Sequence, residues 1–287
     1  MATDIPDDRL NGSISQDEYR RFCELIYRRT GLTFNEAKRY LVDRRVLDRM
    51  AKTGAGSVQS YLALLRFDTT GKELEAIVNS LTVNETYFWR EDHQFSCLTN
   101  SILPDLMHRK SPGERFRIWS LPCSTGEEPY SIAIALLEGW YEVDAYDVEI
   151  TGSDIDTEVL ASARRGIYGA RAVHRLAPEI LARYFEPRAD DQWQVISSLR
   201  ASIDFTHANA ADANSLGAYR NIDVIFCRNM LIYFDDASRR ETAERLYACL
   251  QPGGYLCLGH SESMSRISSL FEVCRFPDAI VYQRPLK

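Results

Sequence analysis

Residues 116–138 read FRIWSLPCSTGEEPYSIAIALLE. The segment opens with apolar residues typical of a buried strand and turns through one proline and one glycine. From Pro129 it continues with apolar residues at helical spacing. A strand followed at once by a helix is the unit of a parallel sheet, because parallel neighbours need a crossover connection. The segment therefore predicts an α/β fold.

The same alternation of strand and helix patterns recurs toward the C-terminus. We predict further strands at 148–151, 222–226, 254–258 and 279–282, and helices at 157–164 and about 236–250. This alternation indicates a doubly wound, Rossmann-like parallel sheet with helices on both faces. The stretch from about 171 to 205 interrupts it with one short helix and two strand-like segments, 193–196 and 201–205, which we interpret as a small antiparallel β-subdomain insert.

Residues 1–80 contain helical patterns and no strand signal. Ser15 and Glu18 form a capping box ahead of the first helix, and a second helix is predicted to start at 33–36. Two more short helices complete the unit. The predicted organisation is an all-helical N-terminal domain (1–80), an interdomain segment (81–94) and an α/β domain (95–287).

Composition excludes several classes of protein. The hydrophobic fraction of 45% and charged fraction of 26% are ordinary for a globular chain. No apolar run approaches the ~20 residues of a membrane helix, and the acidic segment 1–10 does not have the form of a secretory signal. The seven cysteines contain no C-x-x-C pair, which favours reduced thiols, no metal site and a cytoplasmic location.

The net charge of −7 lies outside the first 80 residues, which are close to neutral. An acidic chain argues against general nucleic-acid binding. The helix from Lys38 to Lys52 nevertheless carries six basic residues. We interpret it as a docking surface for an acidic partner, and the alternative is an ordinary solvated helix face.

In an open α/β sheet, ligands bind at the carboxyl ends of the strands. The first such end has one glycine, Gly126, followed by Glu127 and Glu128, which would repel a pyrophosphate and so disfavour NAD. Asp154 ends the next strand, where an acid suits a ribose diol, and Asn209 with Asp212 suits an adenine edge. Together they favour S-adenosylmethionine, whose sulfonium is positive. Taken singly, these residues also have plain structural alternatives, as first-turn charges, helix caps or turn residues.

Five blocks resemble the chemotaxis receptor (methyl-accepting chemotaxis protein) glutamate O-methyltransferases, the CheR-like family. They are LTVNETYFWR (81–90), STGEEPYS (124–131), SDID (153–156), FCRNMLIYF (226–234) and GHSES (259–263). The resemblance covers nearly the whole chain. It implies a bacterial enzyme that moves a methyl group from S-adenosylmethionine to receptor glutamate carboxylates, leaving S-adenosylhomocysteine, in chemotaxis adaptation.

Position by position, the resemblance also implies site residues. Asn84, Thr86 and Arg90 would close over the cofactor, and Glu128 and Asp154 would hold its methionine and ribose ends. The remaining sides would be lined by Asn209, Ala210, Cys227 and Arg228. Arg90 and Tyr233 would face the reacting methyl group.

The chemistry agrees with these roles. A glutamate is ionised at pH 7, so its attack on a sulfonium methyl requires no general base, and the five histidines form no triad with serine or cysteine. Arg90 is suited to grip the carboxylate. An amine methyltransferase would more naturally carry an Asn/Asp-Pro-Pro-Tyr/Phe motif where this chain has residues 228–233.

The resemblance assigns partners as well. The basic helix would dock on the acidic methylation region of a chemoreceptor's cytoplasmic helices. In some members the insert captures the receptor's C-terminal pentapeptide through a glycine-containing loop. Residues 186–191 contain no glycine, which favours a member that does not need this tether. Two alternatives are a methyltransferase for another signalling receptor and a non-catalytic scaffold.

Overall fold

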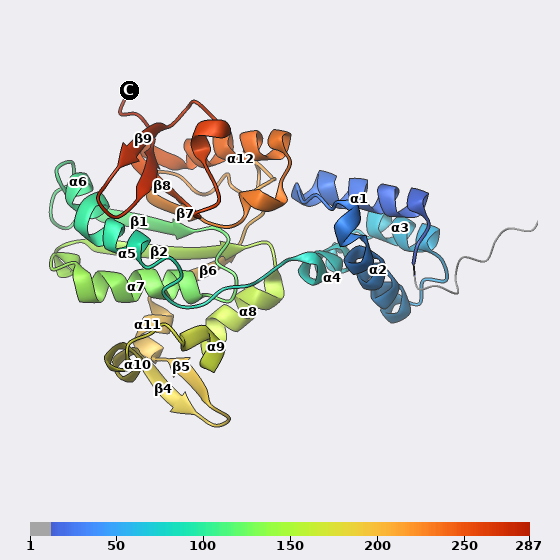
Figure 1. The fold of residues 1–287 in the computed structure, drawn as a ribbon, viewed down its shortest axis with the longest axis horizontal. Coiled ribbons are helices and arrows are strands. Elements are labelled where there is room, and N and C mark those ends of the chain that lie inside the picture. The colour runs from blue at the N-terminus through green and yellow to red at the C-terminus, as the bar shows by residue number, and fades with distance from the viewer. Residues whose placement is uncertain (1–12) are drawn as a thin grey trace, which may run out of the picture. The chain divides into compact units, whose positions relative to one another are not determined.

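A computed structural model of the chain describes residues 13–287, so the prediction for segment 1–10 lies outside the described residues. The chain forms two compact units, Met1–Val83 and Asn84–Lys287 (Figure 1). Within residues 13–287, none of the helices combines the length and apolar character needed to span a bilayer.

The first unit is helical. Its helices are α1 (Gln16–Thr30), α2 (Arg39–Thr53), α3 (Val58–Phe67) and α4 (Lys72–Leu81), and they share an apolar core. The capping box at Ser15 forms as predicted. The second helix begins later than predicted, after a 3₁₀ turn (Glu36–Lys38). The Tyr19 hydroxyl donates to the carbonyls of Phe34 and Asn35, at 3.4 and 3.2 Å, and so engages this segment ahead of the turn.

The second unit is built on a seven-stranded sheet in the order β6-β2-β1-β7-β8-β10-β9. Its strands are β1 (Arg115–Ser120), β2 (Asp147–Asp154), β6 (Ile203–His207), β7 (Ile222–Cys227), β8 (Leu250–Leu258), β9 (Glu272–Arg275) and β10 (Ile280–Gln283). Pairing is parallel from β6 through β8, whereas β10 runs antiparallel to both of its neighbours. The predicted fold class is confirmed, with β9 as an additional edge strand that was not predicted.

Helices cover both faces of this sheet. Helices α7 (Glu127–Gly139) and α8 (Thr157–Arg165) lie on one side and α12 (Asp236–Cys249) on the other (Figure 1). Two shorter helices, α5 (His93–Cys97) and α6 (Leu103–Met107), flank a π-helical turn (Leu98–Ile102). The chain moves outward from β1 to β2 and β6, then returns to β7 on the other side of β1. This reversal opens the crevice where doubly wound sheets bind ligands.

The insert is a separate three-stranded antiparallel sheet in the order β3-β5-β4, formed by β3 (Ile167–Gly169), β5 (Gln192–Val195) and β4 (Phe185–Arg188). It also carries α9 (Ala170–Val173) and α10 (Pro178–Tyr184), and α11 (Ser197–Ala201) leads back to the main sheet. The assignment of 201–205 to the insert is wrong, because β6 pairs in parallel with β2 in the main sheet. Its alternating pattern fits either sheet, and only the long-range pairing decides between them.

Candidate active site

The carboxyl ends of four parallel strands are tied together by backbone contacts. After β1, the Cys123 N–H donates to the carbonyl of Ser153 at 2.8 Å, and after β6 the Ala208 N–H donates to the carbonyl of Asp154 at 3.0 Å. On the other side of β1, the Leu121 N–H donates to the carbonyl of Phe226 in β7 at 2.8 Å. The loops that leave β1, β2, β6 and β7 therefore meet at one edge of the sheet.

Asp154 is the central anion of this edge. Its two carboxylate oxygens accept the backbone N–H groups of Ser124, at 2.9 Å, and Asp156, at 3.0 Å. The residue is only 3% exposed, and burial raises its pKa to about 6. Each carboxylate oxygen keeps a further acceptor site. Asp154 is thus a fixed, buried acceptor that can take two hydroxyl donors.

Residues 84–92 cross this edge and contact the loops after β1 and β2 and the helix α7. The Asn84 side chain donates to Asp156 at 2.9 Å, and the Asn84 carbonyl accepts from the Ser124 hydroxyl at 3.4 Å. Farther along, the Trp89 N–H donates to the hydroxyl of Ser131 on α7 at 3.2 Å. Thr86 lies half-buried within the same segment. Part of the predicted interdomain segment is therefore packed into the second unit.

A buried ion network joins this segment to α7 and the end of β7. Arg228, whose side chain is 2% exposed, contacts Glu128 at 2.8 Å and Glu91 at 3.3 Å. Glu128 also accepts from Ser120 at 2.7 Å, and Glu91 contacts the imidazole of His260 at 2.8 Å. Burial raises the pKa of Glu128 against the opposing charge of Arg228. Burial also opposes ionisation of Glu91, but Arg228 and His260 outweigh it and lower its pKa.

Arg90 and Tyr233 both adjoin the end of β7, since the Arg90 carbonyl accepts from Arg228 at 2.5 Å and Tyr233 lies five residues after Arg228. Burial raises the pKa of the Tyr233 phenol, and the positive charge of Arg90 opposes that shift. Arg90 is partly exposed and donates to the carbonyl of Glu85 at 2.8 Å. Tyr233 ends a 3₁₀ turn (Leu231–Tyr233) that follows β7. The arrangement brings a guanidinium and a phenol from distant parts of the chain to the same edge.

Glu262 holds the loop that carries Tyr233. Its carboxylate accepts three backbone N–H groups, those of Asn229, Leu231 and Gly259, at 2.8 to 2.9 Å. A Cβ atom at Gly259 would lie 2.6 Å from the side-chain Nδ2 of Asn229 and 3.0 Å from its backbone nitrogen, so a larger residue would displace this loop. Glu262 lies in the GHSES block (259–263), and this position was the only sequence signal for a role that was not predicted.

The remaining predicted site residues are the uncharged Asn209, Ala210 and Cys227. Asn209 accepts the Ala211 N–H at 3.0 Å, an Asx-type turn, and its own N–H donates to Ser215 at 2.9 Å. Ala210 is 5% exposed, and Cys227 is fully buried as the last residue of β7. Asn209 and Ala210 follow β6 beside Asp154, whereas Cys227 lies next to Arg228.

Glu127 and Glu128 both lie in the first turn of α7, as predicted, but their side chains have different partners. Glu127 accepts the Thr125 hydroxyl at 2.6 Å, and burial raises its pKa to about 7. Only Glu128 reaches Arg228. Consecutive helical residues differ by about 100° in direction, which separates the two side chains.

Backbone strain gathers at the same edge. Trp89, Glu91, Ser124 and Asn229 all adopt positive φ values, between 48° and 62°. Such conformations cost about 1–3 kcal/mol each for non-glycine residues and persist where the surroundings enforce them. All four adjoin the Asp154 or Arg228 contacts, and these hydrogen bonds and ion pairs hold the backbone in such conformations.

The donor set fits S-adenosylmethionine. Asp154 can accept from a ribose diol, and Arg228 has a buried Nε atom without a protein partner, which suits a carboxylate. Around it, two glutamates and one arginine leave an excess of negative charge, which suits a cationic ligand. No group of metal-ligating side chains occurs within residues 13–287.

Comparison with known proteins agrees with this site. Residues 84–280 match the family model "CheR methyltransferase, SAM binding domain", and residues 17–82 match "CheR methyltransferase, all-alpha domain". The chain is 50% identical over 277 residues to chemotaxis protein methyltransferase 2 of Vibrio cholerae, covering 96% of this chain and 95% of that protein. It is 36% identical over 271 residues to the chemotaxis protein methyltransferase of Salmonella typhimurium, covering 91% and 88%. With the Cher2 chemotaxis methyltransferase of Pseudomonas putida the identity is 32% over 280 residues, covering 95% and 98%.

The doubly wound sheet, its site and the SAM-binding match define an S-adenosylmethionine-dependent methyltransferase. Both family models fall on the two compact units in order. The chain belongs to the CheR family of chemotaxis protein methyltransferases.

Proposed function

We propose that this chain transfers the methyl group of S-adenosylmethionine to glutamate side-chain carboxylates of chemoreceptors in the cytoplasm. The observation that carries the proposal is the partly exposed Arg90, whose carbonyl accepts from the buried Arg228 at 2.5 Å, at the edge where Asp154 is held. A guanidinium fork binds a carboxylate in a fixed orientation. The identity with named chemotaxis methyltransferases supports the same reaction.

The reaction needs alignment more than proton transfer. The cofactor supplies an electrophilic methyl on a sulfonium. A glutamate oxygen forms the new C–O bond as the C–S bond breaks, and the bonding pair stays on sulfur. Arg90 would orient the attacking carboxylate, and Tyr233 would position the methyl end. Asn84, Thr86, Glu128, Asp154, Asn209, Ala210, Cys227 and Arg228 would hold the cofactor. Opposite charges cancel as they react, so a dry site favours the step.

Replacing Arg90 with alanine is expected to lower kcat/KM for a receptor cytoplasmic fragment by about 10- to 100-fold. One lost hydrogen bond to a charged group is worth about 1.5–3 kcal/mol. The measurement is transfer of labelled methyl to the fragment. It is made alongside Arg245→Ala, which removes a guanidinium that pairs with Glu241 on α12.

Full activity of the Arg90→Ala enzyme would overturn its catalytic role. A wild-type enzyme that binds S-adenosylhomocysteine yet methylates no receptor would overturn the proposed substrate and favour another signalling protein. A folded wild-type protein that binds no S-adenosylhomocysteine would instead favour the alternative that the chain is a non-catalytic scaffold.

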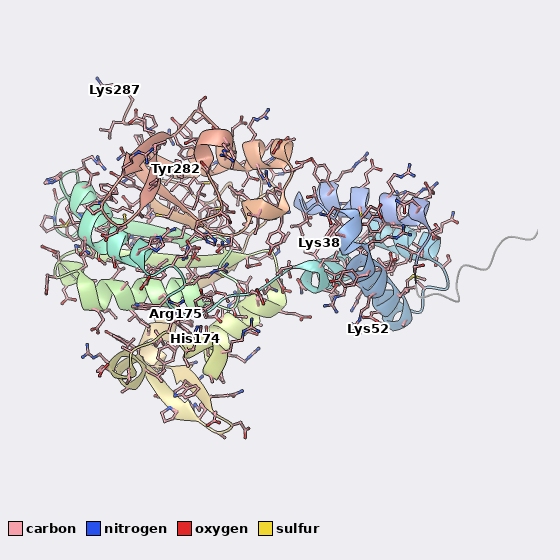
Figure 2. All side chains as sticks on the ribbon, in the orientation of Figure 1. Lys38, Lys52, His174, Arg175, Tyr282 and Lys287 are labelled. Carbon is pink, nitrogen blue, oxygen red and sulfur yellow. The ribbon has the colours of Figure 1, made fainter. Side chains whose placement is uncertain are left out.

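Receptor docking by the basic helix is part of the proposal. Arg44 is exposed in the middle of α2 and Lys52 is exposed near its C-terminal end, and Figure 2 labels Lys38 and Lys52 at the two ends of the helix. Arg49 serves the helical unit itself, because it binds Glu73 at 2.9 and 2.5 Å. We therefore assign docking to the outward side chains of this helix.

Pentapeptide capture is not part of the proposal. The β4–β5 hairpin turns through Asp190 and Asp191, both at positive φ, and its exposed tip is acidic. Such a tip would repel a chain-terminal carboxylate. Removing the last five residues of the receptor is expected to leave the methylation rate within about twofold. A drop of tenfold or more would show that the insert does tether the receptor.

A further inference from the structure

A cationic cluster surrounds Tyr87 on the second unit. The guanidinium carbons of Arg90 and Arg175 each lie 6.0 Å from the centre of the Tyr87 ring, and the His174 ring lies 5.1 Å from it at an interplanar angle of 54°. Arg171 belongs to the same surface, since its guanidinium contacts Glu85 at 3.0 Å and the Glu85 carbonyl accepts from Arg90 at 2.8 Å. We call Tyr87 and these four basic residues the Tyr87 cluster.

The cluster sits on a rigid base. The Phe88 N–H donates to the carbonyl of Ala172 in α9 at 2.9 Å. The Phe88 ring is fully buried in edge-to-face contacts with Tyr168 and Phe185, at 4.8 and 5.1 Å. Residues 84–90 and the insert are therefore fastened together. Figure 2 shows His174 and Arg175 beside each other just after α9.

The charge of the cluster is unbalanced. Arg171 is almost fully solvated, at 89% exposed, and contacts Glu85 at 3.0 Å. Arg175 and His174 are also exposed. Three guanidinium groups thus face one exposed carboxylate, on a unit whose overall charge is negative. A local field of opposite sign to the surrounding protein attracts and orients an acidic partner.

We propose that the Tyr87 cluster docks the acidic side chains that flank the methylated glutamate on the receptor helix. The inference rests on the proposed function and adds a second contact surface, on the catalytic unit itself. Arg90 would hold the reacting carboxylate while Arg171 and Arg175 meet neighbouring carboxylates. Arg90 and Arg175 each lie 6.0 Å from the centre of the Tyr87 ring, so their guanidinium carbons are at most about 12 Å apart. Carboxylates three or four residues apart on one face of a helix fall within that span.

Tyr87 gives the cluster an apolar centre. Tyr87 is half-buried, so part of this aromatic residue remains accessible beside the cations. A helix that presents carboxylates three or four residues apart, with an aliphatic residue between them, matches this pattern. The occupant we assign is therefore an acidic amphipathic helix.

The test is the double variant Arg171→Glu/Arg175→Glu, assayed on a receptor cytoplasmic fragment. Its matched control is Arg240→Glu/Arg245→Glu on α12, which makes the same change in net charge on another face. We expect KM for the fragment to rise at least tenfold at low salt in the first variant and less than twofold in the control. S-adenosylhomocysteine affinity, measured by calorimetry, should match the wild type in both.

Salt and substrate variants sharpen the test. The difference in KM should shrink as salt is raised, because exposed charges are screened. Neutralising the receptor's acidic residues that flank the methylated glutamate should raise the KM of the wild-type enzyme. The same receptor change should raise the KM of the double variant only slightly further. Equal KM values for the double variant and its control would overturn the docking role. A wild type that binds S-adenosylhomocysteine but methylates no fragment would instead overturn the proposed function.

Discussion

Replacing Glu262 with alanine should lower the free energy of unfolding by about 3 kcal/mol or more. The substitution leaves three backbone N–H groups, those of Asn229, Leu231 and Gly259, without their acceptor. Each buried donor without a partner costs about 1–3 kcal/mol. Chemical denaturation of the two proteins, compared through their midpoints at equal slope, measures the difference.

The same substitution is expected to slow the reaction by releasing the loop that carries Tyr233. Glu262→Gln is the graded comparison, because its one amide oxygen can accept only part of the set while its NH₂ group faces another donor. We expect the glutamine enzyme to fall between wild type and alanine in both stability and kcat, with KM for S-adenosylmethionine changed less than kcat. An alanine variant as stable as the wild type would show that water or a shifted loop satisfies these groups.

The main sheet was predictable because its evidence is local. Apolar segments followed by helical spacing mark β1, β2 and β7, and an apolar segment that follows a helical one marks β8, independently of distant parts of the chain. The edge strand β9 (Glu272–Arg275) has only four residues, mostly exposed, and offers too little pattern. The sheet to which β6 belongs is decided by its pairing with β2, between residues about fifty positions apart in the sequence.

The site was predictable where a residue's role follows from its place at a strand end. Asp154 ends β2 and Arg228 follows β7, so topology alone brings them to one edge. Glu91 and Glu262 were not assigned roles, because their partners lie far away in the chain. Glu91 reaches Arg228 over 137 positions, and Glu262 bonds a loop some thirty residues earlier. Contacts between such distant residues produce no repeating pattern of residue types that could be recognised in a single sequence.

Replacing Asp154 with alanine is expected to weaken S-adenosylhomocysteine binding at least about 100-fold. The buried carboxylate has two acceptor sites beyond its bonds to Ser124 and Asp156, which suits a ribose diol. Two hydrogen bonds to a charged group are worth about 3 kcal/mol or more together, and each 1.4 kcal/mol is about tenfold in affinity. Calorimetric titration measures the change. Asp147→Ala, at the exposed start of the same strand, is the control.

The pH dependence of binding separates this role from a loss of structure. Burial raises the pKa of Asp154 to about 6, and the ionised form is the one that accepts both hydroxyl hydrogens. Affinity should be full above about pH 7 and should fall, by up to about tenfold per unit, as the pH drops through 6. Because this pKa is raised, the carboxyl stabilises the unliganded fold more at low pH, through the window between about 4 and 6, so unfolding through this group does not explain weaker binding there. Asp154→Asn, which cannot ionise, should bind weakly with a flatter profile. An unchanged affinity in either variant would show that another group anchors the ribose.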